Sequence, residues 1–300
     1  SEPCQELLGH LKELNYKPNQ IARSLRKGSK NTIGLIVADI SNPFFGQLAR
    51  VVEDEATKLG FTVIIGSSDE SCSKSAILID SLIDRKVDGL IIIPSDGCSD
   101  PIKNLTLNNV PFVLMDRYFP GISTNHVVLD NYSATYSATN HLISKGYTKV
   151  NMIAYKSTLV HMQERIRGYR EAMKVNGLAK EIMVKEVKYH QAQSDMEKIT
   201  DELFKERKIS ALLFATNALS ISGLYAIRKH HIKVPEELAV IGFDGHEVFD
   251  FFQPPVSFIK QPLEEMGRES VKILLDQLSG KKETVHTVLE PQLIKRLSSG

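Results

Sequence analysis

Two acidic residues stand at the ends of apolar segments whose composition is typical of buried β-strands. Asp116 follows residues 112–115, and Asp244 follows residues 239–243. Short, continuous runs rich in β-branched residues predict strands that are covered on both faces of a parallel sheet. Ligands of open parallel sheets bind at the carboxyl ends of the strands, so the pattern predicts that both carboxylates reach one cleft.

Further polar and aromatic residues stand at or just after the ends of strand-like segments. They are, in chain order, Asn42, Phe44, Phe45, Arg117, Asn217 and Phe243. Carboxylates and amides accept hydroxyl donors, a guanidinium donates in a fixed fork, and aromatic rings pack against the apolar face of a sugar. The set predicts a site for a polyhydroxylated small molecule. Simpler alternatives exist, since the aspartates could cap helices and the phenylalanines could belong to the core.

The sequence lacks the motifs of the common enzyme classes. It contains no G-x-G-x-x-G, P-loop, G-x-S-x-G or H-E-x-x-H segment. We therefore predict no catalytic residues, no metal site and no cofactor. One enzymatic alternative stays open, because a facing pair of aspartates could hydrolyse a glycoside by acid and base catalysis.

Apolar segments alternate with amphipathic helical patterns along the chain. Predicted helices such as 45–59, 74–85 and 132–145 lie between predicted strands at residues 33–38, 61–65, 89–93, 112–115, 150–154, 211–215 and 239–243. This alternation predicts a doubly wound α/β fold. Residues 85–93 also parallel residues 207–215, and this weak internal repeat predicts two similar lobes.

The composition supports two lobes and confines positive charge to one end of the chain. The 300 residues are 42% hydrophobic, which suffices for the cores of two lobes. Residues 1–30 carry six Lys and Arg against three Glu, so their net charge of +3 leaves −2 for residues 31–300. We therefore expect a nucleic-acid surface only at the N-terminal end.

The cysteines and the hydropathy bear on the compartment. Cys4, Cys72 and Cys98 show no paired spacing, and such a sparse, odd set fits a reducing compartment and argues against a disulfide framework. No segment is long and apolar enough for a membrane span, and the first residues form no apolar signal segment. We expect a cytoplasmic protein with no membrane partner.

Residues 15–30 combine five positive charges with a helix start. Pro18 ends the preceding helix and Asn19 can cap a new one, with Ile21 and Leu25 on one face. So short a helix is marginal in water, so we expect it to order against a polyanion. Its basic side chains would meet phosphates, and Leu25 would act as an apolar wedge in a minor groove. A basic, solvated linker is the alternative.

These segments together resemble the LacI/GalR family of bacterial transcription regulators over essentially the whole chain. The likeness is carried by residues 15–25 (NYKPNQIARSL), 32–45 (TIGLIVADISNPFF), 116–117, 163–169 and 241–245, and by Gln261. The resemblance implies that residues 15–25 are the hinge helix between a DNA-reading headpiece and an effector domain. The implied operator contacts are Asn19, Ile21, Ala22, Arg23, Leu25 and Arg26. Residues 4–14 would be the last headpiece helix, and we interpret the sequence as lacking the two helices before it.

The resemblance and the strand ends together indicate a set of effector-binding residues. The set is Asn42, Phe44, Phe45, Asp116, Arg117, His161, Arg165, Asn217, Phe243, Asp244 and Gln261. His161, Ala218 and Tyr155-Lys156 depart from the family pattern, which leaves the fold intact but bears on the identity of the effector. We expect this effector to be a small molecule, a carbohydrate.

The resemblance implies the type I fold of periplasmic binding proteins, with two Rossmann-like, doubly wound parallel-sheet lobes joined by three crossovers. We expect a headpiece and hinge remnant at 1–30, a first lobe of 31–129 plus 263–290, and a second lobe of 130–262 plus 291–300. In a homodimer, an effector bound between the lobes would change the separation of the hinges and thereby operator binding. The alternative is a periplasmic-type sugar-binding protein of a transport system, which should lack the basic hinge.

Overall fold

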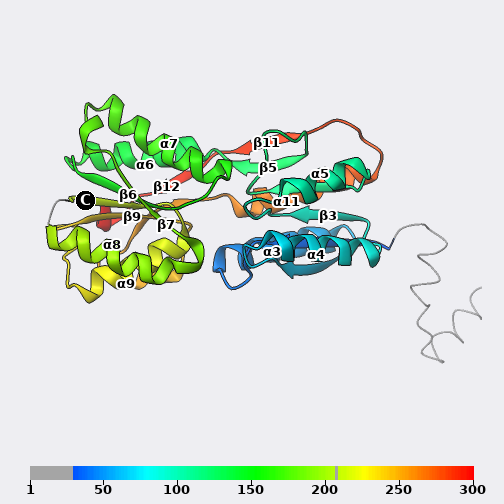
Figure 1. Ribbon diagram of the computed structural model, residues 1–300, viewed down its shortest axis with the longest axis horizontal. Coiled ribbons are helices and arrows are strands. Elements are labelled where there is room, and N and C mark those ends of the chain that lie inside the picture. Colours follow the sequence, from blue (N-terminus) through cyan, green and yellow to red (C-terminus); the bar gives the residue numbers. More distant parts are fainter. Residues whose placement is uncertain (1–29, 207–208) are drawn as a thin grey trace, which may run out of the picture.

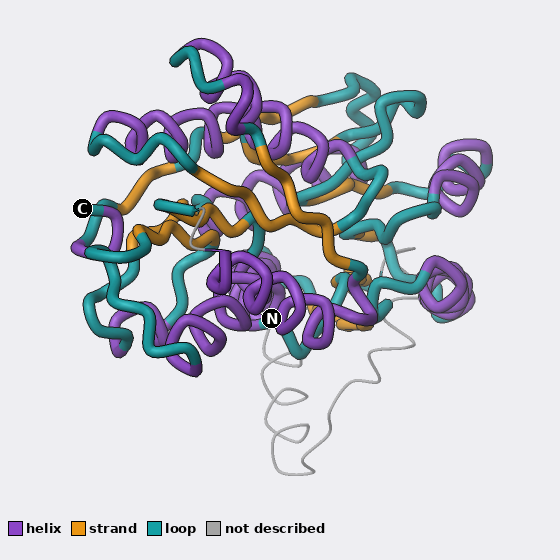
Figure 2. Tube along the Cα trace, turned by 60° about the vertical axis from the view of Figure 1, so that its left-hand side comes forward, coloured by secondary structure: helices purple, strands orange, loops and turns teal. Residues whose placement is uncertain are grey.

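The structure is a computed structural model, and it describes residues 30–206 and 209–300. Figure 1 shows two lobes along the long axis of the molecule, each built around one six-stranded sheet. In Figure 2 the strands run through the interior, with helices on either side of them. Each lobe therefore has the three layers expected of a doubly wound α/β unit.

The first sheet has the strand order β11-β5-β4-β3-β1-β2, and its pairs are parallel. Its strands are β1 (Thr32–Val37), β2 (Thr62–Ser67), β3 (Gly89–Ile92), β4 (Phe112–Met115), β5 (His126–Leu129) and β11 (His286–Leu289). Its helices are α3 (Pro43–Lys58), α4 (Cys72–Asp84), α5 (Ser99–Leu107) and α11 (Leu263–Leu278). Leu35 of β1 packs in the core under α3 and α11, and the next residue, Ile36, packs in the core under α4 and α5. A strand covered on both faces explains the unbroken apolar runs.

The second sheet has the strand order β12-β10-β9-β8-β6-β7, in which only β12 is antiparallel to its neighbour. Its strands are β6 (Val150–Tyr155), β7 (Met183–Val187), β8 (Ala211–Phe214), β9 (Ala239–Phe243), β10 (Ser257–Lys260) and β12 (Gln292–Ile294). The α-helices are α6 (Asn131–Ser144), α7 (Val160–Val175), α8 (Ala192–Glu206), α9 (Asn217–Lys229) and α10 (Glu247–Phe251). The short 3-10 helices are η1 (Ala179–Glu181), η2 (Tyr189–Gln191) and η3 (Leu297–Ser299).

The two sheets repeat one arrangement, in which β1 to β5 correspond to β6 to β10. The segments matched by the weak internal repeat contain β3 and β8, which occupy the same place in their sheets. The predicted fold class is confirmed. The sequence did not reveal β5, β7 and β10, because polar residues interrupt their apolar runs: a histidine in β5, a lysine and a glutamate in β7, and a serine and a lysine in β10.

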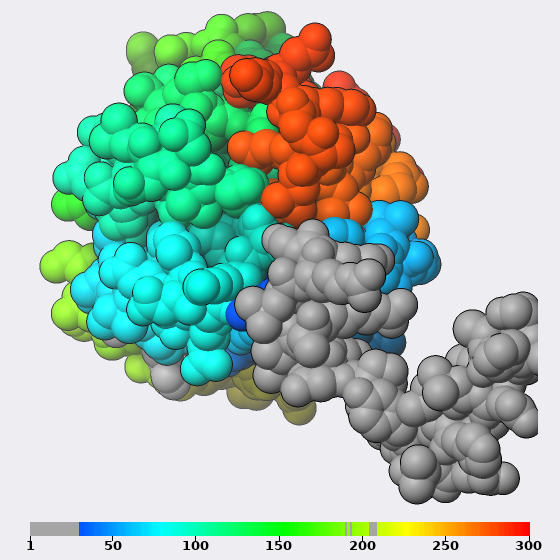
Figure 3. Space-filling model, turned by 90° about the vertical axis from the view of Figure 1, so that its right-hand side faces the viewer, coloured from blue at the N-terminus to red at the C-terminus, as the bar shows by residue number. Residues whose placement is uncertain are grey.

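The chain passes between the sheets three times. It leaves the first sheet after β5, returns after β10 and leaves again after β11. On its return it forms α11, which packs against α3 and whose Gln277 Oε1 accepts the Phe112 N–H of β4 at 3.1 Å. Figure 3 shows this late segment, coloured orange, beside the blue early segments of the first lobe. The domain limits given above stay our prediction of where one lobe ends and the other begins.

The structure contradicts the expectation that the cysteines remain unpaired. Cys72 and Cys98 form a disulfide whose Cα atoms are 5.1 Å apart. They are 26 residues apart in sequence, and they meet because β2 and β3 flank β1, so the loops that follow these two strands lie side by side. Spacing along the chain does not reveal a pair of this kind.

Among the described residues, the helices are all too short or too polar to serve as membrane spans.

The close approach of α6 and α7 gives a test of the fold. A Cβ atom on Gly168 of α7 would lie 2.2 Å from the Tyr132 carbonyl oxygen and 2.5 Å from Thr135 Oγ1. We expect Gly168→Ala to lower the free energy of unfolding by about 1–3 kcal/mol, because the backbone of α6 would have to move. The measurement is urea denaturation. Gly46→Ala is the matched control, since nothing lies within 4 Å of the new Cβ and alanine favours the helix by about 0.5–1 kcal/mol. Equal midpoints for the two variants would contradict the packing.

Candidate functional site

A cavity of about 300 Å³ lies between the lobes and is lined by residues from the loops and helix starts at the carboxyl ends of the parallel strands. It brings together every predicted effector-binding residue except Phe243. These are Asn42, Phe44, Phe45, Asp116, Arg117, His161, Arg165, Asn217, Asp244 and Gln261. Their role in binding an effector stays a prediction, but their convergence is a property of the fold.

Asp116 and Asp244 occupy equivalent places, directly after β4 and β9. Both have left-handed backbone conformations, with φ of 66° and 56°. Such values are uncommon outside glycine, and aspartate is among the residues that tolerate them. Neither residue caps a helix, because Asp116 leads toward β5 and the cap of α10 is His246. The capping alternative is therefore wrong, and the turn instead presents each carboxylate to the cavity.

Burial changes the titration of both aspartates. Burial raises the pKa of Asp116, although the nearby Arg117 and Arg165 guanidiniums oppose the increase. Burial raises the pKa of Asp244 to about 7, against the effects of Arg165 and of the hydrogen bond from Gln261 Nε2, which is 2.8 Å long. The Asp244 carboxyl therefore keeps its proton to a higher pH than an exposed aspartate does.

Arg165 is held from several sides and is buried. Its Nε donates to Asn131 Oδ1 at 2.7 Å, and its Nη1 donates to the Ala215 carbonyl at 2.6 Å. Its guanidinium carbon lies 3.7 Å from the centre of the Phe243 ring. The prediction that Phe243 offers its face to the ligand is not supported, because this ring is fully buried beneath the arginine. Phe243 shapes the cavity indirectly, by supporting Arg165.

Arg117 is paired with a carboxylate that sequence reasoning missed. Its Nη1 and Nη2 each donate to Glu70 at 2.7 Å, in a two-pronged ion pair. Nη1 also donates to the Pro94 carbonyl at 3.3 Å, and Nε lies 3.3 Å from Asp116 Oδ2. Burial alone would lower the pKa of Arg117, but the two carboxylates raise it on balance. Glu70 follows β2, so the strand-end rule that found Asp116 would have found it too.

His161 is a neutral part of the cavity wall. Only 7% of the residue is exposed, and its Nδ1 has no hydrogen-bond partner among the described residues. Burial, with Arg117 and Arg165 nearby, lowers the pKa of His161 well below its usual value. The ring can therefore donate one hydrogen bond and accept another without bringing a charge into the cavity.

Aromatic rings form two walls of the cavity. Phe44 and Phe45 begin α3, whose first turn is capped by Asn42 Oδ1, which accepts the Phe44 N–H at 3.1 Å. Their rings meet edge to face with centres 5.0 Å apart. Tyr155 and Tyr189 of the second lobe have ring centres 5.3 Å apart. The phenylalanines are buried yet line the cavity, so they serve both the core and the site.

Two first-lobe carboxylates join the lobes beside the cavity. Asp96 accepts from the Thr158 N–H at 2.9 Å and from Ser157 Oγ at 3.1 Å. Asp39 accepts from the Tyr189 hydroxyl at 2.6 Å. Burial tends to raise the pKa of each carboxyl, but the hydrogen bonds outweigh it and lower the pKa on balance. The lobes are therefore held together in the described arrangement by contacts that any opening of the cleft must break.

The described residues contain no group of three or more His, Cys, Asp or Glu side chains placed to hold a metal ion. The predicted operator-contacting residues, Asn19, Ile21, Ala22, Arg23, Leu25 and Arg26, lie outside the described residues.

The raised pKa of Asp244 gives a test by pH. The folded state binds the Asp244 proton more tightly than the unfolded state, so the contribution of Asp244 to stability is fully present below about pH 4 and is lost as pH rises to about 7, by up to about 1.4 kcal/mol per pH unit. Asp244→Asn should reduce this slope and leave the part due to Asp116, whose pKa is also raised, whereas Asp80→Asn, at an exposed position of α4, should keep the whole slope. Urea denaturation across that pH range checks the difference. Parallel profiles for the two variants would show that Asp244 titrates normally.

The sequence is similar to known bacterial regulators along nearly its whole length. A family model described as a periplasmic binding protein-like domain matches residues 139–299. The HTH-type transcriptional regulator DegA of Bacillus subtilis is 31% identical over 98% of this chain and 88% of that protein. The ribose operon repressor of Halalkalibacterium halodurans is 30% identical over 93% of this chain and 82% of that protein.

A solved structure agrees with these relatives. A LacI family transcriptional regulator from Enterococcus faecium, with bound ribose, superposes with a TM-score of 0.77 at 27% identity, covering 89% of this chain and 98% of that chain. The family resemblance carried by the motifs is thus confirmed across both lobes. The chain belongs to the LacI/GalR family of transcriptional regulators.

Proposed function

We propose that this protein binds a neutral, hydroxyl-rich small molecule, a carbohydrate, between its lobes. The proposal rests on three buried acceptor atoms that have no hydrogen-bond donor among the described residues. They are Asp116 Oδ1, Asn217 Oδ1 and Gln261 Oε1. A buried polar atom left unpaired costs about 1–3 kcal/mol, so a ligand that donates hydrogen bonds here recovers that free energy.

The charges in the cavity favour a neutral ligand over an anion. Both buried guanidiniums already have hydrogen-bond partners. Arg117 donates to Glu70. Arg165 donates to the Asn131 side chain and to the Ala215 carbonyl. An anionic ligand would have to compete with these groups and approach the Asp116 and Asp244 carboxyls. A polyol meets both kinds of group without adding charge, and its apolar face can pack on the aromatic walls. The ribose bound to the Enterococcus faecium regulator is a ligand of this class.

We further propose that lobe closure controls the binding of operator DNA. The chain enters the first lobe at the amino end of β1, where Lys30 N–H donates to Asp88 Oδ1 at 3.0 Å and Lys30 Nζ donates to the Arg85 carbonyl at 2.8 Å. A rotation of this lobe would therefore carry the preceding basic segment with it. The ligand acts only if it binds one arrangement of the lobes more tightly than the other. Such a protein is a cytoplasmic regulator and not an enzyme.

We expect a homodimer, in which the second subunit contributes a second hinge segment to the contact with operator DNA. We propose that its interface includes the outer surface of the first lobe, around the edge strand β2 and helix α4. Ile64, Ile65, Ile77 and Ile83 are exposed there, Ile77 by 67%. An edge strand beside apolar side chains is a surface that soluble proteins usually cover.

The binding proposal is tested with Arg165→Ala. Isothermal titration against monosaccharides, disaccharides, purines and sugar phosphates identifies the ligand class for the unaltered protein. We expect a neutral sugar to bind, and Arg165→Ala to weaken that binding by about 10- to 100-fold, because charged hydrogen bonds contribute about 1.5–3 kcal/mol. Arg170→Ala, at an exposed position of the same helix, should bind normally. Binding of purines or sugar phosphates alone would overturn the carbohydrate assignment.

The interface proposal is tested with Ile77→Lys. Placing a charge in an apolar interface should shift the protein from dimer to monomer, as measured by light scattering after size-exclusion chromatography. Val175→Lys, at a position that is 65% exposed in the second lobe, is the matched control and should stay dimeric. A dimer that persists in Ile77→Lys at micromolar concentration would move the interface elsewhere.

A further inference from the structure

The disulfide joins two loops that both reach the ligand cavity. Cys72 is the first residue of α4, which follows β2, and Cys98 caps α5, which follows β3. Glu70 stands two residues before Cys72, Asp96 stands two residues before Cys98, and both line the cavity. Because β1 lies between β2 and β3, the disulfide closes over the carboxyl end of β1. A bond between the two sulfurs therefore limits the separation of two parts of the cavity wall.

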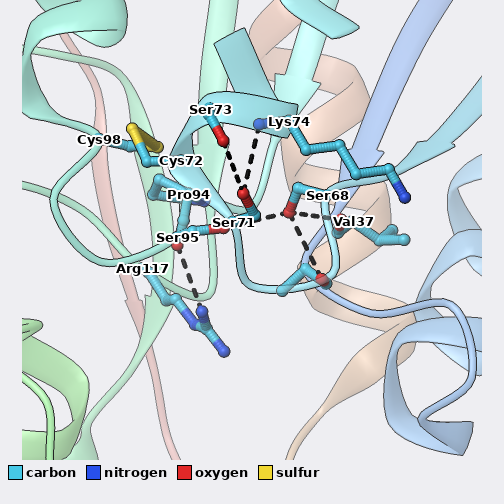
Figure 4. Close-up of a disulfide and its surroundings, with 11 residues drawn as sticks. Val37, Ser68, Ser71, Cys72, Ser73, Lys74, Pro94, Ser95, Cys98 and Arg117 are labelled. Atoms are coloured by element: carbon cyan, nitrogen blue, oxygen red, sulfur yellow. Dashed lines mark hydrogen bonds between the residues drawn. A yellow bond between two sulfur atoms is a disulfide. The ribbon is translucent and has the colours of Figure 1, made fainter. Parts of the chain in front are cut away.

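Both loops hold the same arginine. Arg117 donates to Glu70 in the first loop and to the Pro94 carbonyl in the second. A second link parallels the disulfide, since the hydroxyls of the fully buried Ser68 and Ser95 are 3.1 Å apart. Figure 4 shows the disulfide, the two serines and Pro94 grouped beside Arg117. The position of the guanidinium in the cavity thus depends on how far apart the loops stand.

The first loop needs such support. Asp69 and Glu70 are consecutive residues in the left-handed region, with φ of 51° and 55°. Residues other than glycine rarely adopt this conformation unless the surroundings enforce it. The Glu70 N–H donates to the Ala38 carbonyl at 2.8 Å, and the disulfide anchors the chain two residues later. Cutting the disulfide removes one of the restraints that hold Glu70 against Arg117.

The two sulfurs differ in access. Cys72 is half-buried, whereas only 1% of Cys98 is exposed. A small thiolate therefore attacks the Cys72 sulfur, and Cys98 leaves as the thiolate. Both sulfurs stand at helix N-termini, whose partial positive charge favours thiolate, the form active in exchange.

We propose that Cys72 and Cys98 form a reversible thiol–disulfide site that adjusts the affinity of the ligand cavity, an inference that rests on the proposed binding function. Reduction consumes two molecules of a small thiol such as glutathione. The first forms a mixed disulfide with Cys72, and the second releases the Cys72 thiol and leaves as the small-molecule disulfide. Two electrons and two protons pass to the protein, which ends with two thiols. Oxidation by the same small-molecule disulfide reverses each step. The oxidised form holds Glu70 and Arg117 in place for binding, and the reduced form binds more weakly.

The chemistry is tested without any ligand. The protein, carrying Cys4→Ser so that only two cysteines remain, is equilibrated with reduced and oxidised glutathione at a series of ratios, unfolded in acid and alkylated. Mass spectrometry should find a change from no added groups to two as the buffer becomes more reducing. Two added groups at every ratio would overturn the proposal.

Hydrogen exchange tests the structural consequence. Amides of residues 66–72 and 94–98 should exchange at least about tenfold faster in the reduced protein, because the loops open more often. Residues 211–214 of β8 should exchange equally in both forms. The double variant Cys72→Ser and Cys98→Ser should behave like the reduced protein and ignore dithiothreitol. Identical exchange in the oxidised and reduced forms would show that the disulfide does not restrain the loops, and this result would contradict the proposal.

The effect on the cavity is measured with D-ribose as the probe. The oxidised protein should bind it at least about tenfold more tightly than the reduced protein, by titration calorimetry. Equal affinity in the two forms would overturn the regulatory role. If ribose binds neither form, ribose is not a ligand of the cavity and the proposed binding function loses this support. Alkylation and hydrogen exchange then still decide whether the thiol–disulfide site exists and restrains the loops.

Discussion

The burial of charge between the two lobes is the constraint on which the rest of the site depends. Glu70, Asp116 and Asp244 face Arg117 and Arg165 in a cavity largely removed from water. Charges in such a place are stable only when they neutralise each other and satisfy their hydrogen bonds. The raised pKa of Asp244 is one consequence, because a proton on this carboxyl lowers the number of negative charges buried in the cavity.

The two similar lobes each contribute a buried aspartate to the cavity, from equivalent positions in their sheets. β4 and β9 are equivalent strands, and each ends in an aspartate with a left-handed backbone. Parallel strands direct their carboxyl ends to one edge of each sheet, so two facing lobes bring the aspartates to one cleft. Phe243 then has a different task from the other aromatic residues, since it supports Arg165 from below. Residues that do not line the cavity, such as Phe243, therefore also determine the geometry of the site.

The lobes are also joined by contacts that suit a movable cleft. Asp96 accepts from the exposed Thr158 N–H and Asp39 from the part-buried Tyr189 hydroxyl, and water can take the place of either donor when the cleft opens. By contrast, the Cys72–Cys98 disulfide is covalent and joins two loops of the first lobe that follow neighbouring parts of one sheet. The links between the lobes are thus hydrogen bonds that can exchange with water, which is compatible with the proposed lobe closure.

Much of this protein follows from the sequence by itself. Periodicity and composition are local properties, so they predicted the alternation of strands and helices, the limits of β4 and β9, and the polar residues at strand ends. The family motifs added the two-lobed domain and the expectation that a basic hinge precedes it. Only the tertiary structure decided which side chains meet. The Glu70–Arg117 ion pair, the Cys72–Cys98 disulfide and the stacking of Arg165 on Phe243 each join residues at least 26 positions apart. Such contacts depend on strand order and on the close approach of elements, and no local pattern in the sequence records either.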